Sequence, residues 1–232
     1  MSPRIVAVTG ALVTVLALPA AAHAAQLDQA LRPCYATTQA LDANGDVQDV
    51  SEPVNIKASG FTPNSLVDIS IDGNVVAPNV ATDASGVIGA LSATQLTAPF
   101  MATGQREFTV TITEQGNPAN VVTATAHTTA LGVTVKPQAT KPFKQVRWKG
   151  RGFTAEKAIY AHWVYKGKVR KTVKMSRNPG LCGTFEKKTP QIPVASPGLG
   201  RWTVQFDQAK KFKANPSTTF VRITIVISRQ FG

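Results

Sequence analysis

The residues with the clearest chemical potential in this sequence are cations interleaved with aromatic and β-branched side chains. Seven Lys and Arg residues lie between Lys149 and Lys171, in the stretch KGRGFTAEKAIYAHWVYKGKVRK. Ammonium and guanidinium groups in such a pattern suit a surface that attracts a polyanion. The candidate polyanion-binding residues are Lys166, Lys168, Arg170, Lys171, Lys174 and Arg177. A strand pair with a basic solvent-exposed side explains the same pattern, and the sequence leaves both interpretations open.

Net charge differs sharply between the two halves of the chain. Residues 26–132 contain three Lys or Arg and ten Asp or Glu, whereas residues 133–232 contain twenty-one Lys or Arg and three acids. The formal charges are therefore −7 and +18, and Arg4 completes the total of +12. Either sign alone would keep a protein soluble, so the asymmetry indicates attraction to a polyanion or docking of one half on the other. Complete docking would still leave an excess of positive charge.

Two further motifs resemble ligand sites but are incomplete. Gly150–Ala155 fits G-x-G-x-x-A, yet a dinucleotide site requires an acidic residue about 20 positions later, where this chain has Arg170. The segment 42–49 begins like a calcium-binding loop, but Val47 and Pro53 occupy positions that require Gly and Glu. We therefore expect no cofactor and no metal site.

The histidines do not suggest catalysis. Only His127 and His162 follow the leader, and strand periodicity places His162 on an outer face without an acid, a cysteine or a second histidine nearby in sequence. The sequence contains no G-x-S-x-G, no H-E-x-x-H and no close carboxylate pair in an apolar setting. We therefore expect that the protein is not an enzyme.

The N-terminus predicts export. Arg4 precedes a charge-free apolar run, and Ala22 and Ala24 fit the A-x-A cleavage pattern, so residues 1–24 are expected to form a signal peptide. The run is shorter than the roughly 20 residues of a spanning helix. We expect a secreted, extracytoplasmic protein without a transmembrane segment in the mature chain. An even number of cysteines in an oxidising compartment favours a disulfide bond between Cys34 and Cys182.

The chain contains two copies of one unit. Gly60–Thr62 repeats as Gly152–Thr154 at an offset of 92, and Gly73 repeats as Gly167 at an offset of 94. The second offset continues through three more pairs: Gly86 and Gly180, Gly89 and Gly183, and Phe108 and Trp202. A self-match of about 70 residues that consists largely of turn residues indicates an internal duplication.

Each copy is predicted to be all-β. VDISI, FTVTI, WTVQF and VRITIVIS alternate with period two, and turn residues separate such runs. This pattern favours two tandem immunoglobulin-like antiparallel β-sandwich domains, acidic at 25–132 and basic at 133–232. The predicted core residues are Phe61, Val67, Ile69, Ile71, Phe108, Val110 and Ile112, then Phe153, Trp163, Tyr165, Trp202, Val204, Phe206, Ile223, Ile225 and Ile227.

The hairpin that contains most of the candidate cations turns at residues 166–167. A two-residue loop would place Lys168 beside Tyr165 and Arg170 beside Trp163, at the edge of the core. A longer loop would turn the cations outward, and the sequence does not decide between these geometries.

The repeats resemble a known family. ASGFTPNSLVDISIDG, followed by TDASGVIGAL, is similar to bacterial immunoglobulin-like repeats of the IPT/TIG type, in which a G-F-x-P-x-S turn precedes a strand and a D-G hairpin. The whole mature chain, including YAHWVYKGKVRKTVK and CGTF, more closely resembles uncharacterised two-repeat exported proteins of Gram-positive bacteria. Ala155 and Glu156 depart from the motif, since the first copy has Pro63 and Asn64 there. The resemblance implies a β-sandwich at the cell envelope or secreted, and it implies no active site.

These observations predict an exported, non-enzymatic immunoglobulin-like protein with a binding or structural role at the cell envelope. One alternative is a protein that binds a polyanion through its basic copy: an anionic wall polymer, an anionic lipid or nucleic acid without sequence specificity. The other is an enzyme whose site the sequence does not reveal. The sequence does not specify an oligomeric state.

A Cys34–Cys182 bond would restrict how the copies are arranged. The repeat aligns Cys182 with Ile88 of the first copy, and the bond requires Cα atoms within about 7 Å. Either the second copy folds back beside the first, or the N-terminal segment reaches over to the second copy. The opposite net charges favour the first arrangement, so we predict a compact side-by-side pair.

Overall fold

The computed structural model describes residues 24–89, 94–217 and 219–229, and these are built from β-strands and one turn of 3-10 helix. The predicted signal peptide, residues 1–24, lies outside the described residues except for its last position. The first copy contains β1 (Gln26–Leu27), β2 (Cys34–Leu41), β3 (Val47–Ser51), β4 (Pro53–Ile56), β5 (Ala58–Ser59), β6 (Leu66–Ile71), β7 (Asn74–Ala81), β8 (Thr94–Thr97), β9 (Gln105–Glu114) and β10 (Asn117–Ala130). The second contains β11 (Gly132–Lys136), β12 (Gln145–Arg151), β13 (Ile159–Tyr165), β14 (Lys168–Ser176), the 3-10 turn η1 (Leu181–Gly183), β15 (Phe185–Pro190), β16 (Gly200–Asp207) and β17 (Val221–Ile227).

The second copy is a sandwich of two antiparallel sheets, with strand orders β11-β12-β15 and β14-β13-β16-β17. Aromatic rings join the two sheets. Trp148 of β12 meets Trp163 of β13 edge-on, with ring centroids 6.2 Å apart, and lies 5.2 Å from the ring of Phe206 on β16. Edge-to-face and tilted contacts of this kind are the favoured geometry for aromatic pairs. The predicted immunoglobulin-like fold is confirmed.

The first copy has the same arrangement with one addition. Strands β7, β6, β9 and β10 correspond in order to the four-stranded sheet of the second copy, and β1, β5, β4 and β8 form short pairs that face it across the core. Beyond β10 lie two extra strands, β2 and β3, which extend this sheet to the order β3-β2-β10-β9-β6-β7. The sheets of the second copy contain no strands equivalent to this hairpin among the residues described.

The predicted core agrees closely with the observed one. All seven core residues predicted for the first copy are buried, as are seven of the nine predicted for the second. Ile223 and Tyr165 are only half-buried. Tyr165 stacks on Trp202 at a centroid distance of 4.7 Å, and its hydroxyl donates to the carbonyl of Leu199 over 2.7 Å. This side chain therefore closes the end of the core instead of lying within it.

The structure corrects the alignment of the repeats. Gly86 and Gly183 both have positive φ, at 72° and 65°, and at each a Cβ would clash with the carbonyl oxygen of Phe61 or Phe153 respectively. These two glycines are therefore equivalent, at an offset of 97. The sequence alignment pairs Gly86 with Gly180, three residues short, and this error wrongly aligns Cys182 with Ile88.

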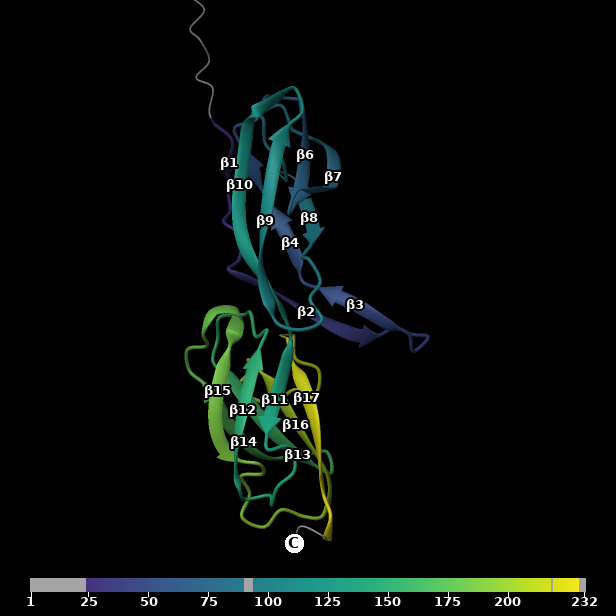
Figure 1. Ribbon diagram of the computed structural model, residues 1–232, viewed down its shortest axis with the longest axis vertical. Helices are drawn as coiled ribbons and strands as arrows, with labels where there is room; N and C mark the ends of the chain where they lie inside the picture. The colour runs from purple at the N-terminus through teal and green to yellow at the C-terminus, as the bar shows by residue number, and fades with distance from the viewer. Residues whose placement is uncertain (1–23, 90–93, 218, 230–232) are drawn as a thin grey trace, which may run out of the picture.

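The side-by-side arrangement predicted for the two copies is wrong. Figure 1 shows the copies end to end along the longest axis of the molecule. Only Leu131 separates the end of β10 from the start of β11, and one residue is too short a connection for a reversal. Cys34 reaches the second copy because β2 runs parallel to the last residues of β10, with Cys34 opposite His127.

Trp148 and Trp163, the two buried tryptophans that face each other, differ in whether the indole N–H has a hydrogen-bond partner. Comparing their substitutions therefore tests what such a bond contributes to stability. Trp163 Nε1 donates to the carbonyl of Gln191 over 2.8 Å, whereas among the described residues no acceptor lies within bonding distance of Trp148 Nε1. Both substitutions to Phe remove similar volume, but only Trp163→Phe leaves a buried carbonyl without its partner. We expect Trp163→Phe to destabilise the protein by about 1–3 kcal/mol more than Trp148→Phe, measured by denaturant unfolding. Equal destabilisation by the two substitutions would contradict this account.

Candidate functional site

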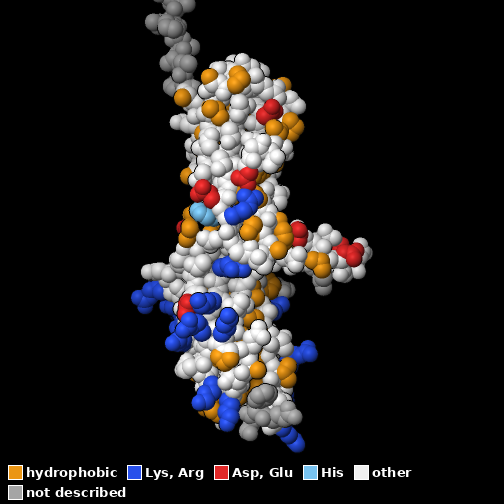
Figure 2. Space-filling view, viewed as in Figure 1, with side chains coloured by type: hydrophobic (Ala, Val, Ile, Leu, Met, Phe, Trp, Pro, Cys, Tyr) orange, Lys and Arg blue, Asp and Glu red, His pale blue; other side chains and the backbone are white. Residues whose placement is uncertain are grey.

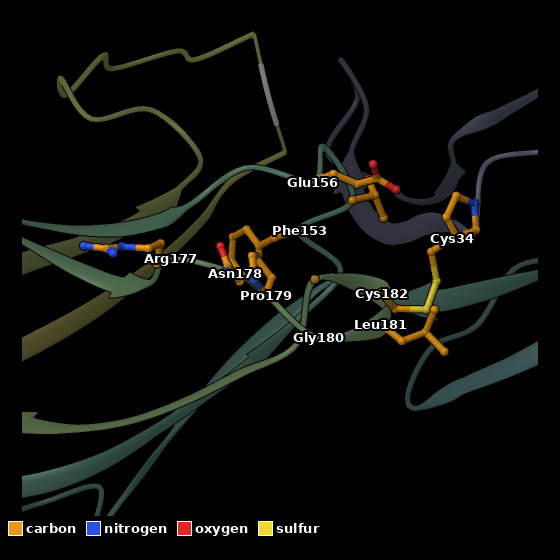
Figure 3. A pocket seen from close by; sticks show the side chains of 12 residues that line it. Cys34, Phe153, Glu156, Arg177, Asn178, Pro179, Gly180, Leu181 and Cys182 are labelled. Atoms are coloured by element: carbon orange, nitrogen blue, oxygen red, sulfur yellow. A yellow bond between two sulfur atoms is a disulfide. The ribbon is translucent and has the colours of Figure 1, made fainter.

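A disulfide bond joins the two copies. Cys34, the first residue of β2, pairs with Cys182 in η1, with Cα atoms 5.2 Å apart and both residues buried. The bond predicted from the sequence is confirmed. Beside it lies a cavity of about 340 Å³ that extends toward Arg177. Figure 3 shows the disulfide at one end of the cavity and the Arg177 side chain directed away from it.

Polar contacts around the disulfide link the same two surfaces. The Thr154 hydroxyl of the second copy donates to the Glu52 carboxylate of the first over 3.0 Å, and Arg32 forms an ion pair with this carboxylate, also at 3.0 Å. Arg151 Nε donates to the carbonyl of Ala130 over 3.1 Å. These contacts and the disulfide together fix the orientation of the copies at the junction.

The candidate cations predicted from the sequence follow one strand. All six are exposed, and five of them lie on β14 or in the turn that precedes it. Arg177 comes directly after β14 and lines the cavity beside the disulfide. We call these six residues the basic edge, because β14 is the outermost strand of its sheet. Lysines on an edge strand also discourage unwanted strand pairing, so their presence there does not by itself show a ligand site.

The hairpin geometry that the sequence left open is a two-residue loop with a bulge. Tyr165 pairs with Lys168, but the register then shifts, so that Lys171 faces Trp163 in place of Arg170. The Arg170 guanidinium carbon lies 5.8 Å from the centroid of the Tyr165 ring, and Lys166 Nζ lies 5.4 Å from it. Both cations therefore lie over an aromatic face at the end of the core, within the range of cation–π contacts.

Sequence reasoning missed a second group of cations on the sheet β11-β12-β15. Lys136, Arg147 and Lys188 are paired in register across the three strands, and all are exposed. Lys149 is one pair further along β12 and points to the same side, because alternate residues of a strand share a face. Figure 2 shows Lys and Arg gathered here around one acidic group. We call Lys136, Arg147, Lys149 and Lys188 the basic face.

Glu186 is the acidic group within the basic face. Its carboxylate lies 2.9 Å from Lys149 Nζ and 3.2 Å from Arg147 Nε. The hydrogen bond from Lys149, supported by the charges of Lys149, Arg147 and Lys188, lowers the pKa of Glu186. A single carboxylate neutralises one of the four cations, so the surface keeps a positive excess at neutral pH.

A groove begins at the end of the basic face near the junction. Its volume is about 730 Å³, and Lys149, Arg151 and Glu186 line it together with the small residues Gly132, Thr134, Gly150 and Thr184. The sequence contained a signal for this surface, since the cations in QVRWKGR alternate with residues that are buried. Their alignment with β11 and β15 could not be predicted without the strand pairing.

The expectation that His162 is an unpartnered surface residue is wrong. His162 is fully buried, and its Nε2 lies 3.3 Å from Asp207 Oδ1 and 3.1 Å from the carbonyl of Ala209. Both neighbours are acceptors, so Nε2 donates to them, and Nδ1 lies 2.9 Å from the hydroxyl of Thr172. The ring is on the outer face of its sheet, as alternation predicts. The segment that follows β16 covers it.

Asp207 is the centre of this buried network. Gln205 Nε2 donates to its carboxylate over 2.7 Å, as does the backbone N–H of Ala209 over 2.8 Å. Burial opposes ionisation, but the hydrogen bonds from His162, Gln205 and Ala209 hold the pKa of Asp207 below its ordinary value. Gln205 also donates to the carbonyl of Lys213 over 2.8 Å, so the network fastens the segment 208–214 across the sheet. A Thr, His and Asp in contact suggest catalysis, but His and Asp are both enclosed, and the two cavities described above lie elsewhere.

The Asp42 side chain likewise bonds to backbone groups. Its Oδ1 accepts the N–H groups of Asn44 and Asp46 over 2.8 and 2.9 Å, and these bonds lower its pKa. The calcium-like spacing is therefore explained by an Asx turn at the tip of the β2–β3 hairpin.

The described part of the chain contains no helix with the length and apolarity to cross a membrane.

Comparison with solved structures gives two similarities at low identity. The chain is similar to a tetra-tandem repeat in the extending region of a large adhesion protein, with 16% identity and a TM-score of 0.29. The match covers 82% of this chain and 55% of that one, so this chain spans about half its length. It is also similar to fibronectin(III)-like modules of Clostridium thermocellum CbhA, with 11% identity, a TM-score of 0.27, and 88% and 93% of the two chains covered. No protein-family model and no curated protein matches the chain, so membership of the IPT/TIG repeats stays a prediction.

Proposed function

We propose that this protein is an exported, non-enzymatic module of the cell envelope that holds an anionic polymer on the basic face of its second copy. The proposal rests chiefly on the row formed by Lys136, Arg147 and Lys188, which β-sheet pairing places side by side on three neighbouring strands. The disulfide supports an oxidising, extracytoplasmic setting.

The geometry of the basic face suits a flexible chain of phosphates. Adjacent strands lie about 4.8 Å apart, and residues on one face of a strand repeat about every 6.6 Å. Lys136, Arg147 and Lys188 therefore form a row across the strands, and Lys149 extends this small grid by one position along β12. The adjoining groove continues this surface, with Lys149 and Arg151 in its lining. A teichoic acid, in which phosphates alternate with polyols, has the charge density that such a grid would neutralise.

The basic face is favoured over the basic edge by its surroundings. Its cations are on the broad side of a sheet and one of them, Lys149, lines the groove, whereas the basic edge follows an outermost strand and two of its cations, Lys166 and Arg170, lie over Tyr165. Edge lysines also discourage pairing with unsuitable strands, so they do not by themselves indicate a polymer site.

Reversing two charges on the basic face is expected to weaken binding of poly(glycerol phosphate) by at least about tenfold at low salt. The variant is Lys136→Glu with Lys188→Glu, which places a carboxylate on each side of Arg147. The slope of log affinity against log salt should become shallower by about 0.7 for each cation that no longer neutralises a phosphate. Fluorescence anisotropy of a labelled polymer, measured over a series of salt concentrations, gives both quantities.

The matched control reverses two exposed lysines outside the face, Lys210→Glu with Lys211→Glu, and so changes net charge by the same amount. The control should bind within about twofold of the wild type, since screened charges at a distance contribute little. Equal weakening in both variants would show a diffuse charge effect and overturn the assignment to the basic face. Stronger weakening from Lys168→Glu with Lys171→Glu would move the site to the basic edge.

A further inference from the structure

The β2–β3 hairpin projects from the body of the molecule. β2 pairs with β10 only through its first four residues, Cys34 to Thr37, and from there on its paired residues face β3 alone. Figure 1 shows the hairpin extending sideways from the level of the junction. We call residues 38–50 the acidic arm. It has no equivalent in the described sheets of the second copy, so the repeat fold itself does not require it.

The arm contributes almost nothing to the core. The first four residues of β3 are exposed, and Val47 and Val50 have 61% and 44% of their surface accessible. A two-stranded hairpin that buries no apolar face is only marginally stable in water. Val47 and Val50 lie three positions apart in β3 and so project from opposite faces of the hairpin, and most or nearly half of each side chain is left uncovered by the rest of the chain.

The arm also carries charge of one sign. Asp42, Asp46 and Asp49 lie within it, and it contains no Lys or Arg. Figure 2 shows acidic and hydrophobic side chains on the projection and no basic ones on the visible face, while basic side chains gather on the second copy. The partner that this chemistry fits is a basic surface with an apolar component.

Such a surface exists on the protein itself. β3 and β14 are both outermost strands, so each has backbone N–H and C=O groups directed away from its sheet. β14 presents Lys168, Arg170 and Lys171 together with Val169, which is 39% exposed. At its far end, the carbonyl of Lys174 already accepts Lys187 Nζ over 2.5 Å, which leaves the Lys168–Lys171 end for a partner.

We propose that the acidic arm of one molecule docks on the basic edge of a second copy, with β3 added beside β14. Strand addition of this kind gains backbone hydrogen bonds, while the side chains select the partner. Like charges along β14 oppose its pairing with another β14, and the aspartates of the arm relieve this repulsion. Because the arm and the edge are different surfaces, the contact is heterologous and links molecules head to tail unless two molecules close reciprocally.

A charge exchange between arm and edge tests this contact. One variant is Asp46→Lys with Asp49→Lys, which leaves the Asp42 turn intact; the other is Lys168→Glu with Lys171→Glu. The wild type should associate at high micromolar concentration in low salt and dissociate in high salt, measured by analytical ultracentrifugation of the disulfide-bonded mature chain. Each variant alone should associate more weakly by roughly tenfold or more, because the arm of one molecule then carries the same charge as the edge of its identical neighbour.

Mixing the two variants is expected to restore association. The lysine arm of one then meets the glutamate edge of the other, and the unaltered arm meets the unaltered edge. A wild type that stays monomeric at every concentration overturns the proposal, as does a mixture that remains monomeric when both variants show a wild-type circular dichroism spectrum. These outcomes do not decide the polymer-binding proposal, which depends on polymer affinity after reversal of Lys136 and Lys188. Lys168→Glu with Lys171→Glu serves there only as the comparison that would move the site to the basic edge.

Discussion

Removing the bond between the two copies, by Cys34→Ser with Cys182→Ser, is expected to lower the free energy of unfolding by as much as about 5 kcal/mol. The bond closes a loop with a sequence separation of 148 residues, and a long loop loses most conformational entropy when it is cross-linked in the unfolded chain. Equilibrium unfolding in guanidinium chloride, followed by tryptophan fluorescence, measures the difference.

The disulfide joins residues of different copies, so its removal should affect both. Wild-type protein treated with a reductant is the control and should match the serine variant. A loss of less than about 1 kcal/mol in the free energy of unfolding would show that the hydrogen bonds of Glu52 with Thr154 and of Arg151 with Ala130 already hold the copies together without the disulfide. A shift confined to one copy would show that the cross-link acts locally.

The second large effect is expected at Asp207. Asp207→Ala removes the acceptor for His162 and Gln205 inside a fully buried network, and breaking such a network on one side costs roughly 3–5 kcal/mol. Asp207→Asn should cost less, because the amide oxygen can still accept from His162 and from the Ala209 N–H. Chemical denaturation is expected to show that the Ala variant is the least stable, the Asn variant intermediate and the wild type the most stable. Equal destabilisation by Ala and Asn would contradict this expectation.

The pH dependence of stability reports on the same carboxyl. Its pKa is lowered in the folded protein, so above about pH 4 it is ionised in both states and its contribution is complete. As the pH falls further, the unfolded chain takes up a proton first, and stability declines until the folded-state pKa is passed. Glu114, which is also buried with a lowered pKa, adds to this decline, so Asp207→Asn should reduce its slope without abolishing it.

The core of this protein was predictable because side chains alternate along a strand. The sequence alignment matches Phe108 with Trp202, but Val110 is the true equivalent, since it faces Ile71 as Trp202 faces Tyr165. A register error of two residues keeps each side chain on the same face, so the predicted core stayed correct. The error at Gly86 is three residues, an odd number, so it broke the alternation and matched Cys182 with Ile88 wrongly.

The candidate sites were less predictable because they depend on contacts between distant residues. Asp207 lies 45 positions from His162, and neither position shows which loop covers the pair. The basic face depends on pairing that brings Lys136 and Lys188 to either side of Arg147. The arrangement of the copies depended on a single residue, Leu131, because β10 and β11 leave no linker that could reverse the chain.

The position of the disulfide also decides how the molecule would carry tension. If a force pulls on Ala24 and Arg229, the covalent path runs from Cys34 to Cys182 through the sulfur atoms, so the chain between them cannot be drawn out while the bond is intact. A released chain lengthens by roughly 3.4 Å per residue, so the shielded loop corresponds to about 50 nm of extension that the bond withholds. Most of the first copy, with β11 to β14 of the second, is therefore protected from mechanical unfolding while the bond is intact. Reduction would convert a short tether into one several times longer.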